Sequence, residues 1–197
     1  MRDDQRRHRL VNSNPWWRAA NAGEDPTAWT AHHRVLQGRS EYDLGFRPSV
    51  LDDVRTGPVM NLLTVLTGPR RIGKSVALLD TAADLCARPD LDPRQVVYLP
   101  CDGMNAQDIH RSLVLARELT RAIDFDQPNP RVWLLDEISG VSGWTSALKP
   151  ARDITDFGDD TVIATGSRWV AGEDVEGNLF AGRAGTTSGR RTRLMLP

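Results

Sequence analysis

The stretch GPRRIGKS, from Gly68 to Ser75, has the G-x-x-x-x-G-K-S spacing of a loop that binds nucleotide phosphates. An apolar run, VMNLLTVLTG (59–68), leads into it, and KSVALLDTAADLCAR (74–88) follows with apolar residues at helical spacing. In a strand–loop–helix unit of this kind, the glycines let successive backbone N–H groups turn toward phosphate oxygens. The start of the helix adds its positive dipole end. We therefore predict a phosphate-binding loop between a buried strand and a helix.

Lysine is rare in this chain, which has 23 arginines but only two lysines, Lys74 and Lys149. A compact ammonium on a flexible stem can curl over a loop and reach the β- and γ-phosphates, which a planar guanidinium does less well. The Ser75 hydroxyl is the predicted magnesium ligand of the loop. We expect the side chains of the two arginines in the loop to face outward. The residues expected to hold the nucleotide are those of the whole loop: Gly68, Pro69, Arg70, Arg71, Ile72, Gly73, Lys74, Ser75 and Val76.

Two acids end another apolar run, VWLLDEI (132–138). The carboxyl ends of strands are where open α/β sheets bind ligands. At that edge Asp136 would hold Mg²⁺, directly or through water, and Glu137 would polarise a water molecule for attack on the γ-phosphate. The alternative is that the two acids simply begin a surface loop.

Hydroxyl and arginine side chains supply the remaining candidates. Thr165 and Ser167 end the run TVIATGS (161–167), on a strand that we expect between the loop strand and the Asp136 strand. Either hydroxyl could contact the γ-phosphate or the attacking water, or could merely cap the following turn. Arg183, in AGRAG (181–185), is a candidate cationic finger for phosphoryl transfer, or part of a solvated basic loop.

Strand and helix patterns alternate from residue 59 onward. Strands are predicted at 59–68, 95–101, 131–138, 161–167 and 191–197, and helices at 74–88, 106–123 and 142–149. This alternation predicts an α/β fold with three layers, in which helices cover both faces of a parallel sheet.

Residues 1–57 are polar, rich in Trp and Arg, and show little periodicity. We expect them to form an N-terminal extension that packs near the nucleotide site, and residues 58–197 to form the core. The aromatic pair Trp16–Trp17 could cover the adenine or belong to the hydrophobic core.

Composition narrows the possible partners. The net charge is −1, but residues 1–18 carry +3 and residues 177–197 carry +4, so the stretch between them carries −8. No apolar run is long enough to span a membrane. Cys86 and Cys101 are too few for a disulfide framework and predict buried free thiols in a reducing compartment. We expect a cytoplasmic protein.

Taken together, the motifs resemble a known group, the AAA-type ATP-binding proteins of bacteria and archaea whose glycine loop reads much like GPRRVGKT. The likeness runs in order through NPWW (14–17), EYDLGFRPSVLDDV (41–54), GPRRIGKS, VVYLPCD (96–102), VWLLDEISGVSGWTSALK (132–149), TVIATGS and the FAGRAG…RLMLP ending. It implies a P-loop NTPase sheet of order 5-1-4-3-2. Lys74 and Ser75 would be Walker A residues, Asp136 and Glu137 Walker B residues, and Thr165 or Ser167 sensor 1.

Longer members of that group continue into a helical lid and a further C-terminal domain. Because this sequence ends at Pro197, we expect an ATPase core without a lid or a sensor 2 arginine. We expect this core to act as a homo-oligomer or with a missing C-terminal partner.

The sequence therefore predicts ATP binding and Mg²⁺-dependent ATP hydrolysis. Two alternatives stay open. One is a nucleotide-binding switch with little turnover, and the other is a DNA-associated defence or mobile-element ATPase whose basic ends contact the phosphate backbone.

Overall fold

Five parallel strands form one sheet in the computed structural model, which describes residues 1–38, 47–60, 62–124, 129–148, 159–167 and the backbone of 189–193. The strand order is β2-β3-β4-β1-β5, which is the predicted order counted from the other edge. Each neighbouring pair is parallel. The bounds are β1 Leu63–Thr67, β2 Val96–Pro100, β3 Val132–Asp136, β4 Thr161–Gly166 and β5 Gly189–Arg193.

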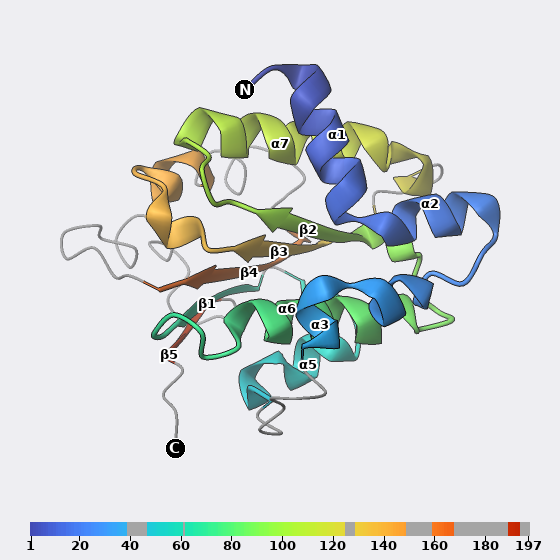
Figure 1. Ribbon diagram of the computed structural model, residues 1–197, viewed down its shortest axis with the longest axis horizontal. Coiled ribbons are helices and arrows are strands. Elements are labelled where there is room, and N and C mark those ends of the chain that lie inside the picture. The colour runs from blue at the N-terminus through green and yellow to red at the C-terminus, as the bar shows by residue number, and fades with distance from the viewer. Residues whose placement is uncertain (39–46, 61, 125–128, 149–158, 168–188, 194–197) are drawn as a thin grey trace.

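Helices cover both faces of this sheet (Figure 1). On one face α6 (Lys74–Cys86) packs against β2, β3 and β4, and α3 (Arg34–Gln37) and α5 (Asp52–Arg55) pack against α6. On the other face lies α7 (Ala106–Leu119). Because both faces are covered, β1, β2, β3 and β4 are largely apolar runs without alternation, and every residue of β1, β3 and β4 is buried. The predicted three-layer α/β class is confirmed.

Most predicted elements lie within a few residues of their expected positions. The predicted helix 106–123 is split into α7 and a 3₁₀ turn, η4 (Arg121–Asp124), and residues 144–148 form the predicted short helix. β5 begins two residues before the predicted strand 191–197, whose last four residues lie outside the described part. The other short 3₁₀ helices are η1 Ala28–His32, η2 Ser49–Leu51, η3 Pro93–Gln95 and η5 Ile138–Gly140.

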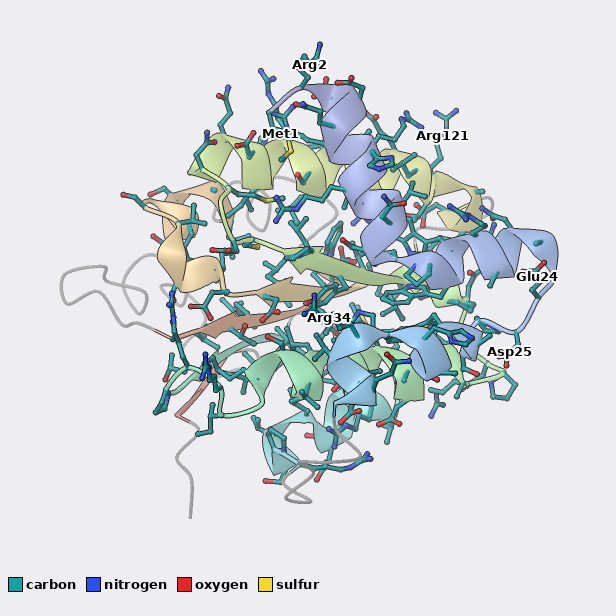
Figure 2. All side chains as sticks on the ribbon, viewed as in Figure 1. Met1, Arg2, Glu24, Asp25, Arg34 and Arg121 are labelled. Atoms are coloured by element: carbon teal, nitrogen blue, oxygen red, sulfur yellow. The ribbon has the colours of Figure 1, made fainter. Side chains whose placement is uncertain are left out.

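The first residues of the chain are more regular than their sequence suggested. They form α1 (Asp3–Ser13), which crosses α7 and β2, and α2 (Pro15–Ala22). α1 buries only Arg6 and Leu10, and the Arg6 guanidinium lies 2.6 Å from the Asp108 carboxylate on α7. Figure 2 shows Met1 beside α7, where its amino group lies 3.2 Å from the same carboxylate. An arginine therefore occupies a buried position that a helix pattern normally gives to an apolar residue.

β2 is an edge strand, and side chains take the place of a further strand along its outer edge. Unpaired backbone groups at a sheet edge invite pairing with other chains, so proteins cover them. Here the carbonyl oxygens of Val96, Tyr98 and Pro100 and the N–H of Tyr98 all have side-chain partners. We call the four residues that supply these partners the edge clamp: Arg9, Asn14, Trp16 and Trp17.

Asn14 is the central member of the edge clamp and is fully buried. Its amide oxygen accepts from the Tyr98 N–H at 2.6 Å, and its amide nitrogen donates to the carbonyls of Tyr98 at 2.9 Å and of Leu10 at 2.8 Å. One side-chain amide thus makes the two hydrogen bonds that a neighbouring strand would make with Tyr98.

The aromatic pair belongs to the core. Trp16 and Trp17 are buried, and both indole N–H groups donate to the Val96 carbonyl at 2.9 Å. Val96 begins β2, so the pair lies at the opposite end of this strand from its carboxyl end. Of the two alternatives for the pair, the core placement is confirmed.

The two cysteines are free and buried, as predicted. Burial raises the pKa of both thiols well above their ordinary value. Within the described part of the chain, every helix is too short or too polar to cross a bilayer.

Asn14→Ala removes the centre of the edge clamp and leaves two backbone groups of Tyr98 buried without partners. Each orphaned group costs about 1–3 kcal/mol, so we expect a loss of unfolding free energy of at least about 2 kcal/mol. The measurement is urea unfolding followed by tryptophan fluorescence. The matched control is Asn12→Ala on the exposed side of α1, expected to cost under about 0.5 kcal/mol. Equal stability of the two variants would contradict the proposed role of the clamp.

Candidate functional site

The glycine loop, residues 68–73, joins the carboxyl end of β1 to the start of α6. Gly68 donates its N–H to the Gly166 carbonyl at the end of β4, at 3.3 Å. Gly73 has φ +93°, which only glycine adopts readily, and no side chain caps the first turn of α6. An uncapped helix start that follows a loop of this shape presents N–H groups and a positive dipole end to an anion.

Lys74 folds back into this loop. Its Nζ donates to the carbonyls of Gly68 and Pro69, both at 2.8 Å, and only 5% of the residue is exposed. Burial lowers the pKa of Lys74, while the negative charges of Glu137 and Asp136 oppose that shift. The ammonium is therefore placed between the loop and the acid pair Asp136–Glu137 at the end of β3, with carbonyl partners that a phosphate could replace.

Asp136 ends β3 as a buried carboxylate with 7% of its surface exposed. Its Oδ1 accepts a hydrogen bond from the Thr165 hydroxyl on β4 at 2.7 Å. Its Oδ2 accepts one from the Tyr98 hydroxyl on β2 at 2.8 Å. Both oxygens are thus fixed by the strands on either side of β3.

Glu137 follows directly, with a left-handed backbone at φ +53°. Its N–H donates to the Thr165 hydroxyl oxygen at 2.9 Å, and its Oε1 accepts from the Ser167 N–H at 3.2 Å and from the Ser167 hydroxyl. Among the described residues, the other non-glycine residue with positive φ is Arg71, at +66° in the glycine loop. Sparsely populated backbone conformations concentrate at functional sites, and here both flank one site.

A close backbone approach joins the ends of β3 and β4. A Cβ added at Gly166 would lie 2.3 Å from the Ser139 Oγ and 2.4 Å from the Ser139 Cβ. The turn after β3, which carries Glu137 and Ser139, therefore rests directly on the backbone of Gly166.

The structure brings together most of the residues predicted for the site. The carboxyl ends of β1, β3 and β4 carry Lys74, Asp136, Glu137, Thr165 and Ser167. Of the two candidate hydroxyls, that of Thr165 donates to Asp136 and that of Ser167 donates to the Glu137 carboxylate. Arg70 and Arg71 are exposed, as expected, and Ile72 is buried. Arg183 lies outside the described residues.

Two residues of this site were missed by the sequence analysis, Tyr98 and Gly166. A tyrosine in an otherwise apolar strand signals a buried hydroxyl that needs a partner, but the sequence does not show which one. Gly166 could be noticed as a glycine at a strand end, but the Ser139 contact is visible only in three dimensions.

The same residues suit a magnesium ion. Mg²⁺ is bound in proteins through one or two carboxylates together with phosphate oxygens and water. Asp136 is such a carboxylate, and each of its oxygens accepts one hydrogen bond and so keeps acceptor capacity. Ser75, the second residue of α6, is half-buried beside Lys74. The donor set therefore fits the cation predicted for this site.

The parallel sheet, the glycine loop and the acid pair define a P-loop NTPase type of α/β domain. The AAA domain family matches residues 60–188, well over half of the sequence, and the chain therefore belongs to this family. Membership assigns it a nucleotide-binding, ATPase-like domain. None of the curated proteins matches the chain closely enough to count as a relative.

Gly166→Ala should push the turn after β3 away from β4, because the new Cβ meets the fixed Cβ of Ser139. Overpacking of this kind costs about 1–3 kcal/mol of unfolding free energy. Chemical denaturation would measure it, with Gly140→Ala as the matched control, since a Cβ there meets nothing within 4 Å. The double variant Gly166→Ala with Ser139→Gly should recover part of the loss. No difference between the two single variants would show that the approach is not tight.

Proposed function

We propose that this chain binds ATP together with Mg²⁺ and hydrolyses it to ADP and phosphate. The observation that carries the proposal is the convergence of Lys74, which follows β1, with Asp136 and Glu137 at the carboxyl end of β3, across the intervening strand β4. Each residue type matches one requirement of phosphoryl transfer: a cation for the phosphates, a carboxylate for the metal, and a carboxylate for the water.

Binding rests on the glycine loop as a Walker A motif. Its backbone N–H groups and the start of α6 would hold the phosphates, and Lys74 would exchange its two carbonyl partners for phosphate oxygens. Ser75 and Asp136 would hold the cation, which when bound neutralises charge on the β- and γ-phosphates. Pro69, Arg70, Arg71 and Val76 would line the loop around the nucleotide.

Hydrolysis rests on Glu137. Its carboxylate would accept a proton from a water molecule while the water oxygen forms a bond to the γ-phosphorus and the bond from that phosphorus to the β–γ bridging oxygen breaks. The proton then passes to solvent. The Thr165 hydroxyl oxygen accepts from the Glu137 N–H and so holds the Glu137 backbone, while Ser167 holds the Glu137 carboxylate. Arg183 remains our candidate for the cation that stabilises the transition state.

A second function, a nucleotide-binding switch with little turnover, is favoured by one contact. Ser167 gives two hydrogen bonds to Glu137 Oε1, and a carboxylate oxygen so engaged has less acceptor capacity left for a water molecule. If Ser167 keeps these bonds when nucleotide is bound, ATP would be held and hydrolysed slowly.

The finer assignments complete the proposal. The loop sequence supports membership in the GPRRVGKT branch of AAA-type proteins, with Thr165 and Ser167 sharing the sensor 1 role. Residues 1–57 would be an extension that reaches the nucleotide site of the core 58–197. Its aromatic residues nearest in sequence to the glycine loop are Tyr42 and Phe46, which lie outside the described residues and are our candidates for covering the adenine. Assembly with a second copy and a cytoplasmic location belong to the same proposal, whereas DNA contact by the basic ends belongs to the alternative of a DNA-associated ATPase.

Lys74→Ala should weaken nucleotide binding. Removing a charge-assisted hydrogen bond to phosphate costs about 1.5–3 kcal/mol, which corresponds to a roughly 10- to 100-fold higher Kd for ATP. Fluorescent ATP binding measures this, with the exposed Arg111→Ala on α7 as a control for lost positive charge. Binding by Lys74→Ala as tight as that of the wild type would refute the central claim.

Glu137→Gln should lower phosphate release by about 10²- to 10⁴-fold while leaving the Kd for ATP unchanged, because the amide cannot take the proton. The same change at Glu118, exposed on α7, is the matched control. A malachite green assay with Mg-ATP would measure release. If the wild type binds ATP but releases phosphate no faster than Glu137→Gln, the switch is the correct function.

A further inference from the structure

Tyr98 links the outer edge of the sheet to the metal-binding acid. Its hydroxyl donates to Asp136 Oδ2 at 2.8 Å, and the side chain is buried. A tyrosine hydroxyl carries its proton at neutral pH and can therefore act as the donor in this bond. A phenylalanine would fill the same space in β2. The hydroxyl is therefore the part of this side chain that acts on the site.

The backbone of Tyr98 is fixed independently of its ring. Asn14 bonds both its N–H and its carbonyl, at 2.6 and 2.9 Å. Asn14 also bonds the Leu10 carbonyl of α1. Residue 98 therefore cannot slide along the sheet edge without breaking its hydrogen bonds to Asn14, and the phenol oxygen is presented to Asp136 from a fixed point.

Two donors on opposite sides determine the orientation of the Asp136 carboxylate. Thr165 holds Oδ1 from β4, and Tyr98 holds Oδ2 from β2. With either donor absent, the carboxylate can rotate about its Cβ–Cγ bond and present its lone pairs elsewhere. Groups that orient a ligand in this way contribute to metal affinity although they do not touch the metal.

We propose that Tyr98 is a positioning residue for the magnesium site, acting through Asp136 and held in place by Asn14 of the edge clamp. This inference rests on the proposed function, since it concerns the cation that accompanies ATP. It assigns a role in the site to β2, a strand to which the motifs of the sequence gave none.

The test is Tyr98→Phe in the full chain, with a fluorescent ATP analogue as the probe. Its Kd is measured in EDTA and then across a titration of MgCl₂, which gives the magnesium concentration for half-maximal enhancement of binding. We expect that concentration to rise about tenfold or more, the range seen when groups that orient metal ligands are removed. The Kd in EDTA should stay at the wild-type value, because the phosphate loop is untouched.

Trp17→Phe is the matched control. It also removes one ring donor to β2, but from the Val96 carbonyl, which keeps its bond from Trp16. It should leave the magnesium dependence unchanged. If Tyr98→Phe and Trp17→Phe shift it equally, Tyr98 acts only through general stability and the inference is wrong.

Measurements on the wild-type protein distinguish a failure of the proposed function from a failure of the role of Tyr98. If it binds the analogue without any effect of MgCl₂, or does not bind it, the proposed function itself fails. If it responds to MgCl₂ and Tyr98→Phe responds identically, this inference alone fails.

A second measurement serves if Tyr98→Phe does not fold. The chain has two tyrosines, so Tyr42→Phe labelled with 3-fluorotyrosine gives one ¹⁹F resonance, from position 98. Adding MgCl₂ to the ADP complex should move this resonance, because a cation bound at Asp136 changes the charge on the carboxylate that accepts the Tyr98 hydrogen bond. A resonance that does not move would overturn the inference.

Discussion

A carboxylate buried at the end of β3 must be hydrogen-bonded on both oxygens, and much of this structure follows from meeting that requirement at Asp136. An isolated buried charge is too costly to keep. The donors come from the two neighbouring strands, Thr165 on β4 and Tyr98 on β2. This arrangement is possible only if β3 lies between them, which the order β2-β3-β4-β1-β5 provides. The strand order is therefore needed for the hydrogen bonding of Asp136, because both of its donors come from the strands next to β3.

That constraint extends to the edge of the sheet. A tyrosine that orients the site from β2 is useful only if β2 is fixed, yet β2 is an edge strand with one strand neighbour. The edge clamp fixes it from α1 and α2 with side-chain hydrogen bonds at Val96, Tyr98 and Pro100. Polar side chains give each backbone group its partner without adding a strand, and they also close the edge to other chains.

Local patterns were sufficient to predict the sheet, α6, α7, the glycine loop and the acid pair, because each is encoded by residues close together in the sequence. The predictions failed where a contact joins distant segments. α1 was missed because its inner face holds Arg6, whose partner Asp108 lies 102 residues away. Tyr98 was missed because an apolar strand pattern does not say where its hydroxyl points. The choice between Thr165 and Ser167 could not be made from the sequence. In the structure the Thr165 hydroxyl is hydrogen-bonded to the Asp136 carboxylate and to the Glu137 N–H. The Ser167 hydroxyl is hydrogen-bonded to the Glu137 carboxylate.

The Thr165 hydroxyl connects the two halves of the proposed chemistry. It donates to the Asp136 carboxylate and accepts from the Glu137 N–H, so it holds both the proposed metal ligand and the backbone of the residue proposed to polarise water. A cation at Asp136 would draw charge from Oδ1, which accepts the hydrogen bond of the Thr165 hydroxyl, and would so weaken that bond. The Glu137 backbone, already in a left-handed conformation at φ +53°, is the neighbouring element that can respond. Its carboxylate is restrained by Ser167 alone among the contacts described. Under the proposed function, the Ser167–Glu137 contact would therefore decide whether the chain turns over ATP or only holds it, once a cation is bound at Asp136.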